Sequence, residues 1–376
     1  MLRPQDSAFR ERKSLNGRWR FTLDPAGVFG DAEMAVPASY NDVVIGGRDH
    51  VGVAWYATTA YVPRGWAGQR VTLHFESATQ RATVWVDDAE VVSHEGGYTP
   101  FEADITDRVV PGTAVTIKVA VDNTLTFRSI PPGVVEQTPA GPRQRYWHDF
   151  FNYAGLHRNV WLCATPPDGI TAVDVVAGHD GTLTYSVRPA DRARVILRAA
   201  DGSPVAAADG GSGTIVVDGV HPWAPGDGYL YDLEAQLLSP AGEVVDSYHR
   251  AVGFRSVAVS GTQLLVNGEP FYFKGFGKHE DIAVLGKGHN DAYLVHDFAL
   301  LDWIGANSFR TSHYRTARTS WTTRTGAASW SSTRPRRSGS TPSWPRARPA
   351  GRRTRRSARI PSTNRPGTCT RRRSGN

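Results

Sequence analysis

Three short stretches of this chain carry side chains that can bind and polarise a substrate. Arg310-Thr-Ser-His313-Tyr314 places a fixed cation near an imidazole, and His279-Glu-Asp281 places an imidazole next to two carboxylates. In the third stretch, Asp149 lies between aromatic residues. A carboxylate flanked by rings can accept hydrogen bonds from vicinal hydroxyl groups while the rings cover the apolar face of a sugar. A turn-capping aspartate explains the same residues locally, so both interpretations of Asp149 stay open at this level.

The first two stretches follow elements of an α/β pattern that begins near Val257. Pro270-Phe-Tyr-Phe-Lys274 is a continuous apolar run, which is typical of a strand in a buried parallel sheet. Ala306–Arg310 predicts the next strand. Residues 290–304 between them predict a helix, because Leu294, Phe298 and Leu301 form an apolar stripe, Asn290 or Asp291 can cap its start and Gly305 follows its end. Strand, helix and strand in this order indicate the opening of a (β/α)₈ barrel, whose chemistry lies on the loops after the strands.

Residues 1–166 predict an antiparallel β-sandwich, and the number of short strands favours a jelly roll. Runs of β-branched and aromatic residues alternate with turn signals, and the clearest runs are Val71–Phe75, Thr83–Val86 and Val115–Val121. Four tryptophans in this region have two interpretations, a sugar-stacking platform or core packing: Trp19, Trp55, Trp66 and Trp85.

Residues 167–256 predict a second sandwich. Pro166-Pro167-Asp-Gly169 is a linker signal, and the residues after it form short strands separated by Asp-Gly and Gly-Gly turns. About 90 residues of this kind indicate a seven-stranded immunoglobulin-like domain. No group of residues in it resembles a catalytic site, so we expect a structural spacer.

The charge of the chain changes abruptly after Tyr314. The 376 residues carry 43 Lys+Arg and 36 Asp+Glu, a net charge of +7, but 17 of those arginines lie in residues 315–376, where there is no Asp, Glu or Lys. Without them, 26 basic residues face 36 acidic ones, so residues 1–314 carry about −10. The basic average is therefore not evidence for nucleic-acid binding. Two cysteines give no disulfide framework, and a charged start without a long apolar run predicts a cytoplasmic protein without a membrane span.

Several longer segments resemble glycoside hydrolase family 2. In the first 166 residues these are Leu15–Phe21, Gly65–Arg70, Gly96–Asp104 and Trp147–Arg158, and in the α/β region Gly275–Asp281 and Asn307–Tyr314. The resemblance implies a jelly-roll sugar-binding domain (1–166), an immunoglobulin-like domain (167–256) and the first two βα units of a TIM barrel (257–314). It also implies retaining hydrolysis of β-D-glucuronides or related glycosides, no cofactor and no metal, and intact enzymes that are often homo-oligomers.

The resemblance assigns roles to four residues. Asp149 and His279 match substrate-binding positions, since the family's loop around Asp149 reaches into the active site. Arg310 matches a guanidinium that can orient and acidify a neighbouring carboxylate, and His313 lines the site. No catalytic residue can be assigned, because the family's two catalytic glutamates belong to later barrel strands and this chain has no acidic residue after Asp302. The chain as written is therefore expected to be inactive.

The family signature continues with proline after Tyr314, whereas this chain has Arg315. A shifted reading frame in GC-rich DNA explains this departure. Residues 330–341 can be encoded so that the neighbouring frame reads Val-Val-Ile-Asp-Glu-Thr-Pro-Ala-Val-Gly-Leu-Asn, which resembles the family's next barrel strand. We therefore expect residues 315–376 to be an out-of-frame, disordered, Arg-rich tail, and the unclosed barrel to expose apolar strand edges and lower solubility.

Three other functions remain possible on the sequence. The sugar could be a galactoside or a mannoside, because the residues that recognise the glucuronate carboxylate belong to later barrel strands. Residues 1–256 could act as a carbohydrate-binding module without catalysis. The arginine-rich tail could bind nucleic acid, which would require salt-dependent affinity that is lost on deleting residues 315–376.

Overall fold

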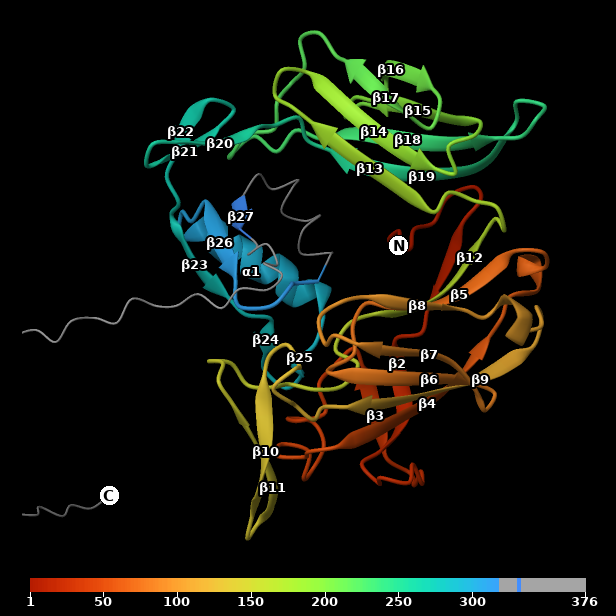
Figure 1. Cartoon of the computed structure of the whole chain (residues 1–376), viewed down its shortest axis with the longest axis vertical. Coiled ribbons are helices and arrows are strands. Elements are labelled where there is room, and N and C mark those ends of the chain that lie inside the picture. Colours follow the sequence, from red (N-terminus) through yellow and green to blue (C-terminus); the bar gives the residue numbers. More distant parts are fainter. Residues whose placement is uncertain (318–329, 333–376) are drawn as a thin grey trace, which may run out of the picture. The chain divides into compact units, whose positions relative to one another are not determined.

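The structure is a computed structural model and describes residues 1–317 and the backbone of residues 330–332. The first domain is built from a six-stranded sheet, in the order β3-β2-β4-β9-β6-β7, and a four-stranded sheet, in the order β1-β12-β5-β8, both antiparallel (Figure 1). The strands are β1 (Glu11–Ser14), β2 (Gly17–Thr22), β3 (Glu33–Val36), β4 (Val53–Tyr61), β5 (Arg70–Phe75), β6 (Arg81–Val86), β7 (Ala89–Glu95), β8 (Phe101–Asp104), β9 (Ala114–Asp122) and β12 (Val160–Thr165), with 3₁₀ turns η1 (Arg64–Trp66) and η2 (Thr106–Arg108). This is the sandwich that the sequence predicts.

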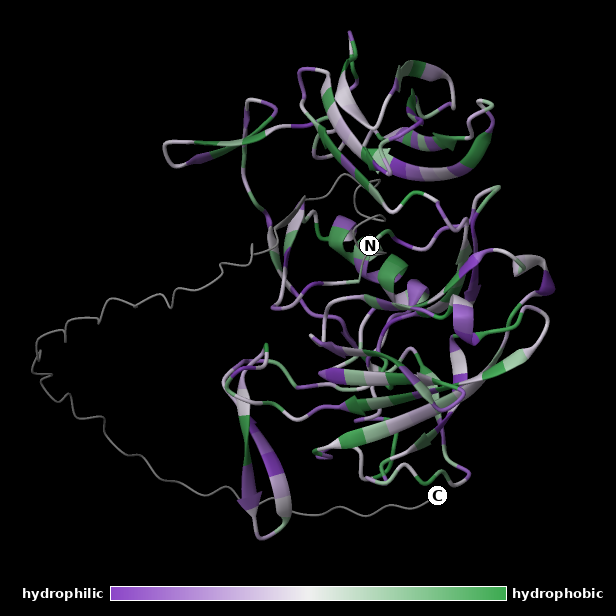
Figure 2. Cartoon of the chain, turned by 45° about the vertical axis from the view of Figure 1, so that its right-hand side comes forward, coloured by the Kyte–Doolittle hydropathy of each residue, from purple (hydrophilic) through white to green (hydrophobic). Residues whose placement is uncertain are grey.

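Alternation of apolar and polar residues decides which face of each strand is buried. In β9, Val115, Ile117, Val119 and Val121 are buried, while the residues between them are partly exposed. The hydropathy colouring changes from residue to residue along these strands (Figure 2). Since successive side chains point to opposite faces of a sheet, each strand contributes one face to the core.

The four tryptophans of this domain divide between two environments. Trp19 and Trp66 are buried in the core between the sheets, whereas the rings of Trp55 and Trp85 stack on each other with centroids 5.4 Å apart. Trp19 and Trp66 therefore follow the core interpretation. A hairpin of β10 (Gly133–Thr138) and β11 (Gly141–Tyr146), which the sequence analysis did not predict, leads directly into the stretch around Asp149.

The second domain has seven strands in two antiparallel sheets, as expected for an immunoglobulin-like fold. One sheet contains β13 (Ala172–Ala177), β14 (Thr182–Arg188) and β17 (Ser212–Val216); the other contains β16 (Pro204–Asp209), β15 (Ala193–Arg198), β18 (Tyr231–Leu238) and β19 (Val244–Val252). A buried ion pair joins the N-terminal segment to this domain, because Arg10 Nε donates to Asp246 Oδ1 of β19 at 2.8 Å.

The barrel segment begins with a small antiparallel sheet and then becomes parallel. The antiparallel strands are β20 (Val257–Ser260), β21 (Gln263–Val266) and β22 (Glu269–Phe271); the parallel ones are β23 (Gly275–Lys278), β26 (Ser308–Thr311) and β27 (Trp330–Ser332), with a short β24 (Asp281–Ile282) and β25 (Gly286–Lys287) pair between. The prediction of a parallel strand at Pro270–Lys274 is wrong. Its first residues belong to antiparallel β22 and Tyr272 is exposed, whereas the first barrel strand is Gly275–Lys278.

The helix α1 (Asp291–Trp303) connects β23 to β26 and confirms the predicted capping. The Asn290 side chain accepts hydrogen bonds from the amides of Ala292 and Tyr293, and Gly305 has φ +70°, a conformation that favours glycine. The predicted stripe is buried, and Phe298 packs against Phe309 of β26 with ring centroids 5.9 Å apart. This βα unit places the residues after β23 and β26 at the same edge of the sheet.

The strand β27 lies inside the segment expected to be a disordered tail, and for residues 330–332 that expectation is wrong, because their backbone pairs in parallel with β26. The other residues of that segment beyond residue 317 lie outside the described part of the chain. Among the described residues, no helix has the length and apolar character needed to cross a membrane.

Candidate functional site

The four residues singled out in the sequence lie close together in the structure. His279 directly follows β23, Arg310 lies in β26, His313 follows β26, and Asp149 lies in the loop between β11 and β12 of the first domain. The parallel register of β23 and β26, with Lys278 opposite Thr311, brings His279 and His313 to the same sheet edge. Their ring centroids are 5.7 Å apart.

A short hydrogen-bond chain orders the side chains at this edge. Arg310 Nη2 lies 3.2 Å from His313 Nδ1, and His313 Nε2 lies 3.0 Å from Asp149 Oδ1. Because the guanidinium can only donate, Nδ1 accepts and the ring proton sits on Nε2, where it is donated to the carboxylate. Arg310 thus fixes the tautomer that holds Asp149.

Asp149 is held in its ionised form while its side chain stays exposed to solvent. Desolvation raises its pKa, but the hydrogen bond from its own backbone amide and the nearby His313 ring outweigh this, so the pKa lies below its ordinary value. An exposed, ionised carboxylate can accept two hydroxyl hydrogen bonds from a ligand. The His279 Nδ1 atom is shielded from water, has no hydrogen-bond partner among the described residues and lies 4.0 Å from Asp281 Oδ2.

Phe150 packs the loop of the first domain against the barrel segment. Its ring centroid lies 5.3 Å from that of Tyr314, 6.2 Å from His313 and 6.3 Å from His279. His148 stacks on the same ring at 4.1 Å, and neither of its ring nitrogens has a partner among the described residues. The aromatic residues flanking Asp149 therefore contribute packing between the two segments.

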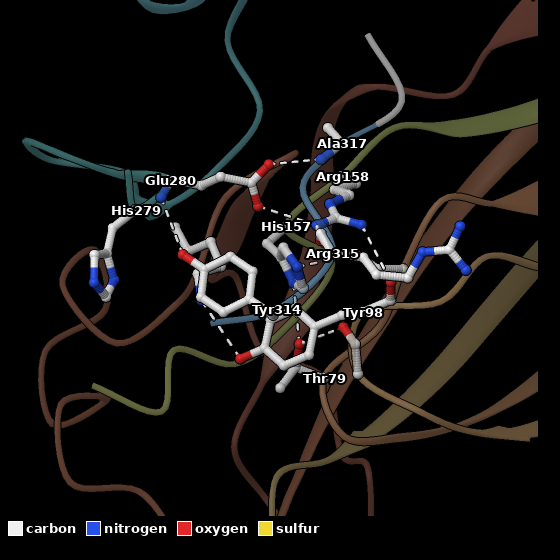
Figure 3. Close-up of polar contacts among 12 residues, drawn as sticks. Thr79, Tyr98, His157, Arg158, His279, Glu280, Tyr314, Arg315 and Ala317 are labelled. Carbon is white, nitrogen blue, oxygen red and sulfur yellow. Dashed lines mark hydrogen bonds and ion pairs between the residues drawn. The ribbon is translucent and has the colours of Figure 1, made fainter. Parts of the chain in front are cut away.

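Behind these residues lies a buried polar network that the sequence analysis did not identify (Figure 3). Arg158 Nη2 donates to Glu280 Oε2 at 3.0 Å, and the other Glu280 oxygen accepts the amide of Ala317 at 2.6 Å. The Glu280 amide in turn donates to the Tyr314 hydroxyl at 3.0 Å. Glu280 is the neighbour of His279, so the network holds the His279 loop against the residues after β26.

A buried lysine completes this network. Lys287 Nζ lies 3.5 Å from the centroid of the Tyr314 ring and 3.4 Å from the Tyr98 hydroxyl, and the rings of Tyr98 and Tyr314 stack at 4.5 Å. Desolvation lowers the pKa of Lys287 to about 7. Both Arg158 and Glu280 fall inside the sequence segments that suggested the family, but no local pattern in those segments marks either residue as buried.

The carboxylates here do not form a hydrolytic pair or a metal site. Glu280 is committed to Arg158 and Ala317, and Asp149 to His313. Within the described residues no group of three or more His, Cys, Asp or Glu side chains could hold a metal ion. The arrangement can therefore bind and orient a polar ligand, and the chemistry of bond cleavage needs further groups.

Three family models match consecutive parts of the chain. They are the sugar binding domain of glycosyl hydrolases family 2 at residues 29–166, the model named glycosyl hydrolases family 2 at residues 167–255, and the family's TIM barrel domain at residues 257–324. The barrel match thus extends beyond Tyr314, where the sequence departs from the family signature.

Known proteins similar to this chain are β-glucuronidases. That of Paenibacillus borealis is 46% identical over 339 residues, covering 84% of this chain and 57% of the relative, and that of Sus scrofa is 41% identical over 359 residues, covering 84% and 55%. Among solved structures, β-D-glucuronidase of Dictyoglomus thermophilum has a TM-score of 0.83 and 38% identity, covering 88% of this chain and 59% of that one. The Ruminococcus gnavus enzyme in complex with D-glucuronic acid has a TM-score of 0.84 and 33% identity, covering 88% and 61%. The chain therefore spans little more than half the length of the curated relatives it matches.

Proposed function

Because the chain belongs to glycoside hydrolase family 2, we propose that the complete protein hydrolyses β-D-glucuronides with retention of configuration. Residues 1–317 supply the part of the site that binds the sugar. The proposal is supported by the similar proteins, which carry the name β-glucuronidase, and by a solved relative that is a complex with D-glucuronic acid.

One observation carries the proposal: Asp149, from the first domain, meets His313, from the barrel segment, at 3.0 Å. Its free carboxylate oxygen and the neighbouring His279 ring provide an acceptor and a polar ring for adjacent sugar hydroxyls. Arg310 holds His313 and offsets the negative charge of Asp149 at this edge, which reduces the repulsion that an acid sugar would meet there. Asp149 and His279 therefore bind the sugar, and Arg310 and His313 position Asp149.

Retaining hydrolysis needs an acid/base and a nucleophile, two carboxylates about 5 Å apart across the sugar. The chain has no acidic residue after Asp302, so neither can come from the segments that follow β26 as they are written. We propose that a shift of reading frame near codon 315 accounts for this, and that the 376-residue chain binds the sugar without cleaving it.

Two experiments test these statements separately. If the gene downstream of codon 314 contains no alternative frame with glutamates in barrel-strand contexts, the frameshift proposal is wrong. The second experiment purifies the chain with the restored frame and offers it p-nitrophenyl β-D-glucuronide and p-nitrophenyl β-D-galactoside. Cleavage of the glucuronide but not the galactoside supports the proposed activity. Cleavage of the galactoside alone would identify a galactoside as the substrate.

A binding experiment tests the site on the chain as it is. We expect D-glucuronate to bind the 376-residue chain and Asp149→Asn to weaken that binding about tenfold, the effect of losing one hydrogen bond to a charged group. Asp209→Asn is the matched control, because Asp209 is also an exposed aspartate in an ion pair, with Arg194 at 2.7 Å in the second domain. A cytoplasmic location stays a prediction.

A further inference from the structure

A cavity of the first domain, with Pro167 of the following linker at its border, shares no residue with the candidate site. It measures about 420 Å³ and is lined by Trp66 of η1, Arg70 of β5, Asp104 of β8, Asp107 of η2, and the two prolines Pro111 and Pro167. This volume falls in the range of ligand pockets, about 300–1,000 Å³.

The lining of this cavity includes a fixed charged pair. Arg70 Nε donates to Asp104 Oδ2 at 2.7 Å, and Asp104 Oδ1 accepts both the amide and the hydroxyl of Thr106, at 3.1 and 2.6 Å. These bonds fix the orientation of the carboxylate, while the terminal nitrogens of Arg70 have no hydrogen-bond partner among the described residues. A carboxylate and a guanidinium side by side can bind two adjacent hydroxyl groups. The carboxylate accepts a hydrogen bond from one hydroxyl, and the guanidinium donates one to the other.

Two further polar groups at the cavity have no hydrogen-bond partner within the described residues. The Asp107 carboxylate lies one residue beyond Thr106 in η2, and Gln69 Oε1 is shielded from water without a donor. A shielded carbonyl oxygen without a donor costs about 1–3 kcal/mol. A ligand hydroxyl that reaches the amide after a rotation of the Gln69 side chain would remove this cost.

The lining also includes apolar rings. The Trp66 ring is buried beneath it, with its indole N–H already donated to Glu11 at 2.7 Å. Pro111 and Pro167 add rigid apolar rings. A lining with both polar groups and apolar rings matches the two kinds of surface of a pyranose, whose hydroxyls lie around the ring edge and whose C–H groups form its faces.

We propose that this cavity is a second carbohydrate site, which binds a neutral pyranose unit through adjacent hydroxyl groups. The charged residues that line the cavity are the carboxylates Asp104 and Asp107 and the cation Arg70, and their summed charge of −1 disfavours a uronate. The candidate site differs, because its Arg310 offsets the negative charge of Asp149. The two sites therefore differ in local charge.

The test is a titration of the full 376-residue chain with methyl β-D-glucopyranoside and, separately, with sodium D-glucuronate, followed by saturation-transfer NMR and calorimetry. We expect the neutral glucoside to bind, and Arg70→Met or Asp107→Asn to weaken its binding about tenfold. Arg194→Met is the matched control, since Arg194 also forms a surface pair, with Asp209, at the same 2.7 Å distance as the Arg70–Asp104 pair. Asp149→Asn should leave glucoside binding unchanged.

Three results would overturn the proposal: no binding of the glucoside near its solubility limit, binding that Arg70→Met and Asp107→Asn both leave intact, or binding that Asp149→Asn abolishes. Failure of this cavity to bind the glucoside is distinguishable from failure of the proposed function. The proposed function is tested by the binding of D-glucuronate and by the effect of Asp149→Asn on that binding. An unchanged melting temperature in Asp107→Asn, a nearly isosteric variant, separates loss of binding from loss of folding.

Discussion

Replacing Glu280 by glutamine tests whether the buried ion pair behind the candidate site holds its loops together. Glu280 accepts hydrogen bonds from the Ala317 amide at 2.6 Å and from Arg158 at 3.0 Å. Glutamine keeps the shape of the side chain but offers one oxygen instead of two, so one of these donors must face an NH₂ group. We therefore expect Glu280→Gln to release the His279 loop and the residues after Tyr314 locally, while both sandwich domains stay folded.

The size of the effect follows from the burial of the pair. The Arg158 and Glu280 side chains are only 4% and 15% exposed. Removing one partner of such a pair costs about 3–5 kcal/mol, because the remaining charge is left buried and unpaired. Arg158 keeps hydrogen bonds to the carbonyls of Tyr98 and Arg315, which places the cost near the lower end, about 3 kcal/mol. The locally open state should thus become about a hundredfold more populated.

Hydrogen–deuterium exchange measures this opening directly. At pH 7, amides in peptides covering residues 279–289 and 312–317 should exchange about a hundredfold faster in Glu280→Gln, while those of β9 should not change. Glu136→Gln is the control, because Glu136 pairs with Arg145 at 3.1 Å in an exposed hairpin and should have little effect. The double change Arg158→Met with Glu280→Met should recover part of the protection. Exchange at the wild-type rate in Glu280→Gln, or no recovery in the double variant, would show that the buried ion pair does not hold these loops.

The same ion pair makes the site sensitive to acid. Desolvation raises the pKa of Glu280, but Arg158, the Ala317 amide and Lys287 outweigh this, so its pKa lies below the ordinary value of 4.5. The ionised form is favoured in the folded state, so its contribution is complete above about pH 4.5 and is lost as the pH falls through the lower, folded-state pKa. In the Glu280→Gln variant, exchange of the two loops should no longer respond to acid in this range.

Three other substitutions probe the frame around the site. The pKa of Lys287 is about 7 in the folded protein and 10.5 when the side chain is exposed. Between these pH values the unfolded chain binds more protons, so the free energy of unfolding rises with pH. Lys287→Met should reduce this rise, measured by urea unfolding between pH 6 and 9.5. Arg10→Met leaves the buried Asp246 without its cation and should lower stability by about 3–5 kcal/mol, measured as a lower urea midpoint. Gly155→Ala should lower the melting temperature of the protein more than Gly141→Ala. Both glycines have positive φ, so both substitutions strain the backbone. At Gly155 the new Cβ would also collide with the Tyr56 hydroxyl, whereas nothing lies within 4 Å of a Cβ at Gly141.

The sandwich strands could be predicted because burial alone determines their pattern. Alternation in Val115–Val121 and a buried stripe in α1 are local signals, and the structure follows both. The first barrel strand could not be placed in this way. Pro270–Lys274 is apolar enough for a buried strand, but Asn267-Gly268 before it forms a tight hairpin turn with positive φ at both residues, which pairs β22 with β21 instead. The strand that enters the parallel sheet is Gly275–Lys278, where a Cβ on Gly275 would collide with the Ser308 carbonyl.

The residues of the candidate site could be predicted from local sequence patterns, but their arrangement in space could not. Asp149, His279, Arg310 and His313 could be selected because they are polar groups at predicted strand ends or in a loop of distinctive sequence. The hydrogen-bond chain runs from Arg310 to His313 and then to Asp149. Because His313 and Asp149 are more than 160 positions apart, no local sequence pattern contains this contact. The Arg158–Glu280 pair is missed for the same reason: each residue alone reads as a surface charge. Only the packing of the first-domain loop on the barrel edge buries both, and burial turns an ordinary ion pair into a contact on which the His279 loop depends.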